Sequence, residues 1–148
     1  MDYPEIAARL ILATVVGGGI GLNRDLHEKP TGVRTLGLVG LGSALVVLAS
    51  TGFATDAPNW DAISRAIQGV ITGIGFLGAG VIIRRAEGAG IQGLTTAACI
   101  WLTAGLGMVC AVGAWIAVLI SVPLLFLVLI FGGAVENTFH RLWRSDDD

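Results

Sequence analysis

Charged residues divide the chain into long uncharged stretches, and the lengths of these stretches predict its secondary structure. The first apolar run covers residues 6–22 and contains a single charge, Arg9, while the runs at 35–55 and 66–83 contain none. Each is close to the ~20 residues that an α-helix needs to cross the ~30 Å hydrocarbon core of a bilayer. The pattern therefore predicts three membrane-spanning helices over residues 6–83.

A longer uncharged run separates Glu87 from Glu136. As one straight helix it would be about 72 Å long, more than twice the thickness of the hydrocarbon core. Two spans joined by a tight turn are expected instead, at 94–111 and 114–134, with Gly113 at the turn. The pair Gly105 and Gly107 is a rival break point. The predicted fold is an all-α transmembrane bundle of about five spans.

The composition supports this class. Hydrophobic residues make up 54% of the chain and charged residues 14%, and the mean hydropathy is +0.79. Soluble domains carry about 25% charged residues, so a water-soluble enzyme is not expected. A disordered chain is excluded, because the apolar residues can offset the entropy cost of ordering the chain. The lipid bilayer is the first expected partner, and no basic stripe indicates nucleic acid.

The basic residues predict the orientation of the spans. Only Arg9 and Arg65 fall on one side of the predicted topology, and a long side chain such as Arg9 can snorkel to the membrane surface there. Seven fall on the other side, which the positive-inside rule assigns to the cytoplasm: Arg24, Lys29, Arg34, Arg84, Arg85, Arg141 and Arg144. The N-terminus is then outside. Residues 1–135 form the transmembrane domain, and 136–148 form a short cytoplasmic tail.

An internal repeat is suggested when the chain is shifted by 61 residues. The shift aligns Gly17 with Gly78, and the other identities are Gly19 with Gly80, Arg24 with Arg85, Gly32 with Gly93, Thr35 with Thr96 and Leu41 with Leu102. A parallel two-helix duplication about an axis along the membrane normal would produce this pattern. It would place the two basic loops side by side.

Small residues recur at helical spacing in the first and third spans, and two interpretations remain open. Glycines let membrane helices approach closely, which would put these spans at the crowded centre of the bundle. Alternatively, the third span is locally unwound and its carbonyl groups face a ligand, as in broken transporter helices. The candidate packing or pathway residues are Gly17, Gly21, Gly69, Gly73, Gly75, Gly78 and Gly80.

Polar residues gather at the predicted cytoplasmic ends of the spans. They form either solvated turns or a surface that contacts a partner: Arg24, Asp25, Arg34, Thr35, Arg84, Arg85, Thr95 and Thr96. No nucleophile–base pair, zinc motif or phosphate-binding loop is present, so no enzymatic activity and no cofactor are expected. Cys99 and Cys110 are expected to be packing residues. Spans two to five have no Asp, Glu, Lys, Arg or His in their interiors, although intramembrane ion paths usually carry such charged residues.

Several of these segments together resemble one protein family. Residues 21–25 (GLNRD), 32–35 (GVRT), 73–80 (GIGFLGAG) and 93–98 (GLTTAA), followed by Trp101, occur in this order. Over about residues 6–135 the chain is similar to the MgtC/SapB family of bacterial inner-membrane proteins. It departs from many members in having Asn23 where Glu is common, and in lacking their cytoplasmic C-terminal domain.

The resemblance implies a multi-pass inner-membrane protein linked to magnesium homeostasis, to growth in low magnesium and, in pathogens, to virulence. It further implies a non-enzymatic regulator of other membrane proteins, including the proton-translocating ATP synthase. The alternative is a divalent-cation transporter or channel, with magnesium as substrate instead of effector. Metal-ligating residues and the oligomeric state, including a homo-oligomer, remain open.

Overall fold

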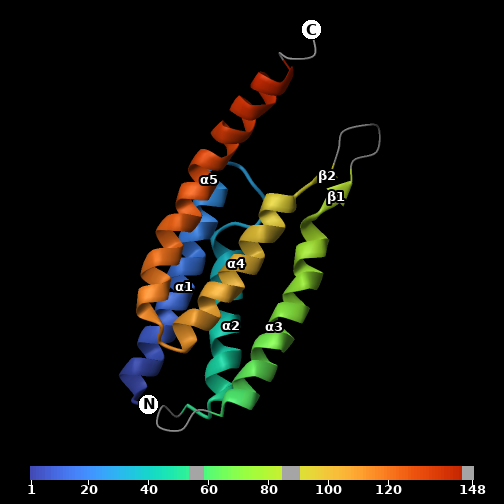
Figure 1. The fold of residues 1–148 in the computed structure, drawn as a ribbon. Coiled ribbons are helices and arrows are strands. Elements are labelled where there is room, and N and C mark those ends of the chain that lie inside the picture. Colours follow the sequence, from blue (N-terminus) through green and yellow to red (C-terminus); the bar gives the residue numbers. More distant parts are fainter. Residues whose placement is uncertain (54–58, 85–90, 145–148) are drawn as a thin grey trace. The chain divides into compact units, whose positions relative to one another are not determined.

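The computed structural model of the chain describes residues 1–53, 59–84 and 91–144, and is dominated by helices (Figure 1). All five helices are long and apolar enough to cross a membrane, which confirms the all-α transmembrane class. The elements in chain order are α1 (Tyr3–Leu26), α2 (Val33–Ser50), α3 (Trp60–Val81), β1 (Ile83–Arg84), β2 (Ile91–Gln92), α4 (Leu94–Ala111) and α5 (Trp115–Arg144).

The helix boundaries follow from local chemistry. Pro4 lies in the first turn of α1, where its missing N–H has no intrahelical partner to lose. The Asn59 side chain caps α3 by accepting the N–H of Ala62 at 3.1 Å. The break between α4 and α5 falls at Gly113, whose φ of +76° suits glycine. The turn predicted there is confirmed, and the rival break at Gly105 and Gly107 lies inside α4.

The chain divides into two compact units, Met1–Trp115 and Ile116–Asp148. In the first unit, α4 packs against α1, α2 and α3, and α2 packs closely against α1. Three glycines allow these backbones to approach: Gly17 and Gly40 where α1 crosses α2, and Gly107 where α4 crosses α2. A Cβ atom on any of them would lie closer than 3.0 Å to a carbonyl oxygen of the facing helix.

The expectation that the first and third spans form the crowded centre is correct for α1 and wrong for α3. Gly17 and Gly21 of α1 face backbone atoms of the α2 region. By contrast, a Cβ on four of the α3 glycines (69, 73, 75 and 80) would meet nothing within 4 Å, and one on Gly78 would make only ordinary contact with Ala97. The crowded helices are α1, α2 and α4, because the facing partner decides whether a glycine is needed for packing. α3 is a continuous helix through its glycine-rich segment.

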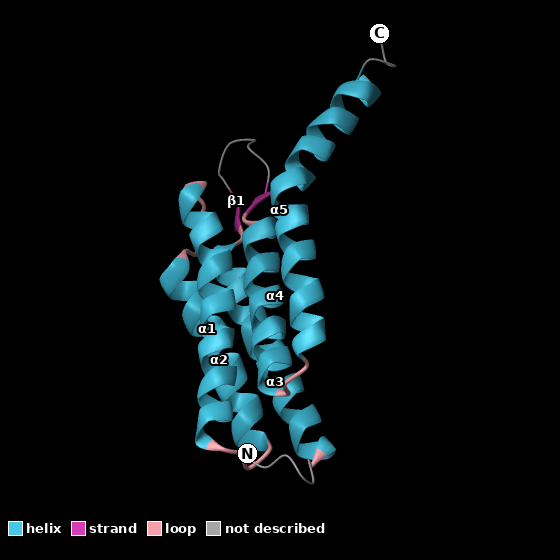
Figure 2. Cartoon of the chain, turned by 90° about the vertical axis from the view of Figure 1, so that its left-hand side faces the viewer, coloured by secondary structure: helices cyan, strands magenta, loops and turns pink. Residues whose placement is uncertain are grey.

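The turn between α1 and α2 and the β1–β2 hairpin lie at the same end of the first unit, away from the N-terminus (Figures 1 and 2). In the hairpin, Ile83 pairs with Gln92 and Arg84 with Ile91. Gly93, the N-cap residue of α4, has a φ of +94° and lies close to the carbonyl group of Val81, the last residue of α3. The 61-residue repeat itself stays a prediction.

The second unit consists of most of α5, whose Trp115–Gly133 stretch is the most apolar candidate span and contains Pro123. In the first unit, Cys99 and Cys110 are buried and free, as expected for packing residues. Thr103 is also buried, and its hydroxyl donates to the carbonyl of Cys99 at 2.7 Å. This bond satisfies a polar group in the middle of α4 without a partner from another helix.

Candidate functional site

The site lies at the end of the first unit where α1 ends and α2 and α4 begin; we call it the polar end. Its centre is a hydrogen bond from Nη2 of Arg24 to Oγ1 of Thr96, 2.7 Å long, between residues 72 positions apart in the chain. Arg24 sits in the last turn of α1, and Thr96 sits in the first turn of α4. The bond therefore joins the C-terminal end of α1 to the N-terminal end of α4.

Arg24 is almost fully enclosed, because only 7% of its surface is exposed. Its Nε has no hydrogen-bond partner among the described residues. A buried cation is costly unless hydrogen bonds compensate for its lost hydration. The guanidinium therefore acts as an internal brace between α1 and α4 and is not available at the surface.

Asp25, the next residue, shapes the turn into α2. Its Oδ2 accepts the N–H of Val33 at 2.9 Å, and a Cβ on Gly32 would collide with this carboxylate. The interaction caps the start of α2 from eight residues away, and the negative charge suits the positive end of the helix dipole. Gly32 is required because its missing side chain leaves room for the carboxylate.

Replacing Asp25 with Ala is expected to lower the free energy of unfolding by about 1 kcal/mol, the usual cost of losing a helix cap. The Asp25→Asn variant keeps an acceptor oxygen and should lose less than half of that. Denaturant titration of the detergent-solubilised protein, followed by circular dichroism, measures both. Equal losses in the two variants would contradict the capping role.

The remaining candidates of the polar end form its outer layer. Arg34 and Thr35 are exposed at the start of α2, and Thr95 is exposed beside the buried Thr96. The backbone of Arg84 lies in β1, while its side chain and all of Arg85 fall outside the described residues. Within the described part of the chain, no group of three or more His, Cys, Asp or Glu residues is placed to hold a metal ion.

A second buried arginine lies at the opposite end of the first unit, where sequence reasoning expected Arg9 to snorkel. That expectation was wrong: Arg9 is only 8% exposed, donates to the carbonyl of Ala111 and pairs with Glu5. Its Cζ lies 5.8 Å from the ring centroid of Trp115, within reach of a cation–π interaction. It ties α1 to the turn after α4. The one charge inside the first apolar run was the signal that could have indicated this contact.

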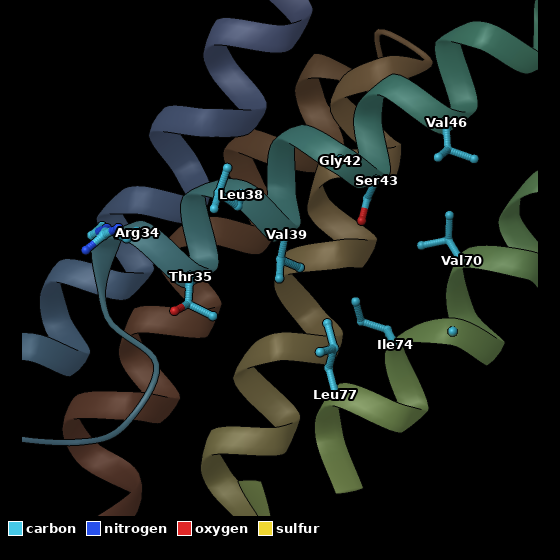
Figure 3. Close-up of a pocket in the computed structure, with 11 residues that line it drawn as sticks. Arg34, Thr35, Leu38, Val39, Gly42, Ser43, Val46, Val70, Ile74 and Leu77 are labelled. Atoms are coloured by element: carbon cyan, nitrogen blue, oxygen red, sulfur yellow. The ribbon is translucent and has the colours of Figure 1, made fainter. Parts of the chain in front are cut away.

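A lateral groove runs between α2 and α3 and begins at the polar end (Figure 3). Its volume is about 680 Å³. Arg34 and Thr35 stand at one end, and Val46 and Val70 stand at the other. The sequence did not predict this groove, because its existence depends on how far α3 stands away from α2.

Comparison with known proteins confirms the family resemblance. The sequence model of the MgtC family matches residues 10–138. SrpB of Synechococcus elongatus is 44% identical over 97% of this chain and 79% of its own length. YhiD of Escherichia coli K12, a proposed magnesium transporter, is 43% identical over 93% of this chain and 62% of its own length.

A third relative, MgtC of Salmonella typhimurium, is 40% identical over 75% of this chain and 45% of its own length. The chain thus spans less than two thirds of the length of YhiD and of MgtC. No solved structure matches the chain.

Proposed function

We propose that this chain, which belongs to the MgtC family, is a magnesium-related regulator that binds other membrane proteins through its polar end. Five apolar helices and the bacterial relatives make it a multi-pass protein of the bacterial inner membrane. The name magnesium transporter proposed for YhiD supports the link to magnesium. In this proposal the chain acts on its partners by binding them and carries out no catalysis of its own.

The observation that carries this role is the brace between Arg24 and Thr96. It holds the ends of α1 and α4 together, and the Asp25 carboxylate ties the start of α2 to α1 through the N–H of Val33. The exposed Arg34, Thr35 and Thr95 are therefore presented on the first turns of fixed helices. A preorganised surface loses little conformational entropy when a partner binds. The basic residues predict that this surface faces the cytoplasm, where a regulatory partner would reach it.

The proton-translocating ATP synthase, expected from the family resemblance, is the first partner to test. A tagged chain carrying Arg34→Ala and Thr95→Ala is expressed in a bacterium that lacks its own family member, and ATP synthase subunits are quantified after co-purification. Loss of central contact residues should reduce recovery about fivefold or more. Growth at limiting magnesium should fall in parallel.

Arg65→Ala is the matched control, since Arg65 is exposed near the start of α3, far along the helix from the polar end. It should retain full recovery of the subunits. Unchanged recovery by the double variant, with normal membrane insertion, would contradict the proposed contact surface.

The alternative function is transport of magnesium, which the name proposed for YhiD favours. It would require a pathway beside or through α3, whose glycine-rich segment is a continuous helix. Purified chain in liposomes loaded with a magnesium-sensitive dye tests it directly. Dye signal that rises with protein dose, and only with a magnesium gradient, would replace the regulatory proposal with a transport function.

A further inference from the structure

We propose that the groove between α2 and α3 is a binding site for an anionic phospholipid, with an acyl chain between the helices and the phosphate beside Arg34. This inference rests on the geometry of the groove and does not depend on the regulatory role. Figure 3 shows the lining residues of the two antiparallel helices and the order in which they follow one another.

The length of the groove fits one leaflet of a bilayer. From Arg34 to Val46, α2 advances twelve residues, or about 18 Å at 1.5 Å per residue. Half of a ~30 Å hydrocarbon core is about 15 Å, so a groove that starts at the membrane surface ends near the midplane. The volume of about 680 Å³ lies within the range of known small-molecule sites.

The walls of the groove are apolar and are kept open by glycine. A Cβ on Gly42 of α2 or on Gly73 of α3 would meet nothing within 4 Å, so both positions face free space. The hydroxyl of Ser43 lies in the half of the groove nearer Val46 in Figure 3. The apolar lining residues offer hydrocarbon surface suited to an acyl chain: Leu38, Val39, Val46, Val70, Ile74 and Leu77.

The chemistry at the surface end favours a negative headgroup. Arg34 is exposed there, and the hydroxyl of Thr35 lies next to it at the positive end of the α2 dipole. The carboxylate of Asp25 is already bonded to the N–H of Val33. Among the described residues the ion pair is that of Arg9 with Glu5, so no described carboxylate is paired with the Arg34 guanidinium. Basic pockets between membrane helices are known sites for anionic headgroups.

A transmembrane helix of another protein fits the groove less well. Such a helix is 10–12 Å wide with its side chains and would contact its neighbours through both leaflets. The groove instead ends at Val70, although α3 continues ten residues further back to Trp60. A flexible chain anchored at one surface matches a site of this length.

The test compares lipid binding by the purified full chain in detergent, with native mass spectrometry as the readout. Phosphatidylglycerol should be retained in preference to phosphatidylcholine, whose headgroup carries a cation that Arg34 would repel. Arg34→Gln should weaken phosphatidylglycerol binding about fivefold, the factor that corresponds to one basic group near an anionic surface. Arg65→Gln should not change it, and inorganic phosphate should not compete.

A second pair of variants tests the groove without touching a charge. Gly73→Leu places a side chain inside the groove and should abolish lipid retention, whereas Gly75→Leu, on the opposite face of α3, should leave it unchanged. Both positions have free space for a side chain, so both variants should fold. Only the lipid proposal predicts this difference, because neither glycine belongs to the surface proposed to contact the ATP synthase.

Three results would overturn the proposal: equal retention of the two lipids, unchanged binding by Gly73→Leu, or competition by inorganic phosphate alone. A membrane protein that occupies the groove in place of lipid, shown by cross-linking from position 73, would also overturn it.

Discussion

The Gly107→Val variant is expected to lose the packing of α4 against α2 and to unfold at much lower denaturant than the parent protein. A Cβ on Gly107 would lie closer than 3.0 Å to the carbonyl oxygen of Gly40, and a backbone atom cannot move aside as a flexible side chain can. Overpacking of a close-packed core costs about 1–3 kcal/mol and sometimes more. We expect a loss at or above 3 kcal/mol in the free energy of unfolding, measured by denaturant titration with circular dichroism in detergent.

Gly105→Val is the matched control, because it makes the same change in the same helix two residues away. A Cβ at Gly105 would meet nothing within 4 Å, so this variant should differ from the parent by less than about 1 kcal/mol. A second pair repeats the comparison in α1, where Gly17→Ala should destabilise and Gly19→Ala should not. If the two variants of each pair were equally stable, close contact between the helix backbones would not be required for the stability of the fold.

The Thr96→Val variant is expected to give the second large effect. Valine has nearly the shape of threonine but cannot accept the hydrogen bond from Nη2 of Arg24. The guanidinium would remain buried with a second unsatisfied donor in addition to Nε. Leaving a buried charged donor unsatisfied costs more than the ~1–3 kcal/mol of a neutral group, so we expect a loss of about 3 kcal/mol in the free energy of unfolding.

Two controls separate the lost hydrogen bond from the general effect of substitution. Thr96→Ser keeps the hydroxyl and should retain most of the stability. Thr95→Val changes the neighbouring exposed threonine and should be nearly neutral. In a double-mutant cycle, Arg24→Met should remove most of the cost of Thr96→Val, since the stranded charge is then gone. A cycle without coupling would contradict the brace between α1 and α4.

Much of the secondary structure could be predicted because hydropathy is a local property. The tight turn at Gly113 follows from the length of the uncharged run, which is too long for one span. The helix ends were less predictable. α1 extends past Arg24 to Leu26. The charged Arg24 can remain inside the helix because a residue of another helix accepts a hydrogen bond from its side chain. α3 begins at Trp60, before the apolar run at 66–83, because Asn59 caps the helix there.

The sequence grouped the residues of the polar end but could not assign a role to each of them. Arg24, Arg34, Thr95 and Thr96 were grouped because they lie at the same ends of the predicted spans. Their different environments were beyond sequence reasoning. Arg24 and Thr96 are buried against each other, while the other two are exposed, and this difference separates a structural brace from a surface available for contact.

The sequence alone determined that the chain is a bundle of membrane helices and that the last two spans are separated at Gly113. These properties depend on local hydropathy and on the thickness of the bilayer. Only the tertiary structure decided which glycines are crowded, that Arg9 is buried, and that a groove opens between α2 and α3. Each of these depends on the surface of a second helix, and glycines with the same spacing are packed in α1 and open in α3 because different surfaces face them.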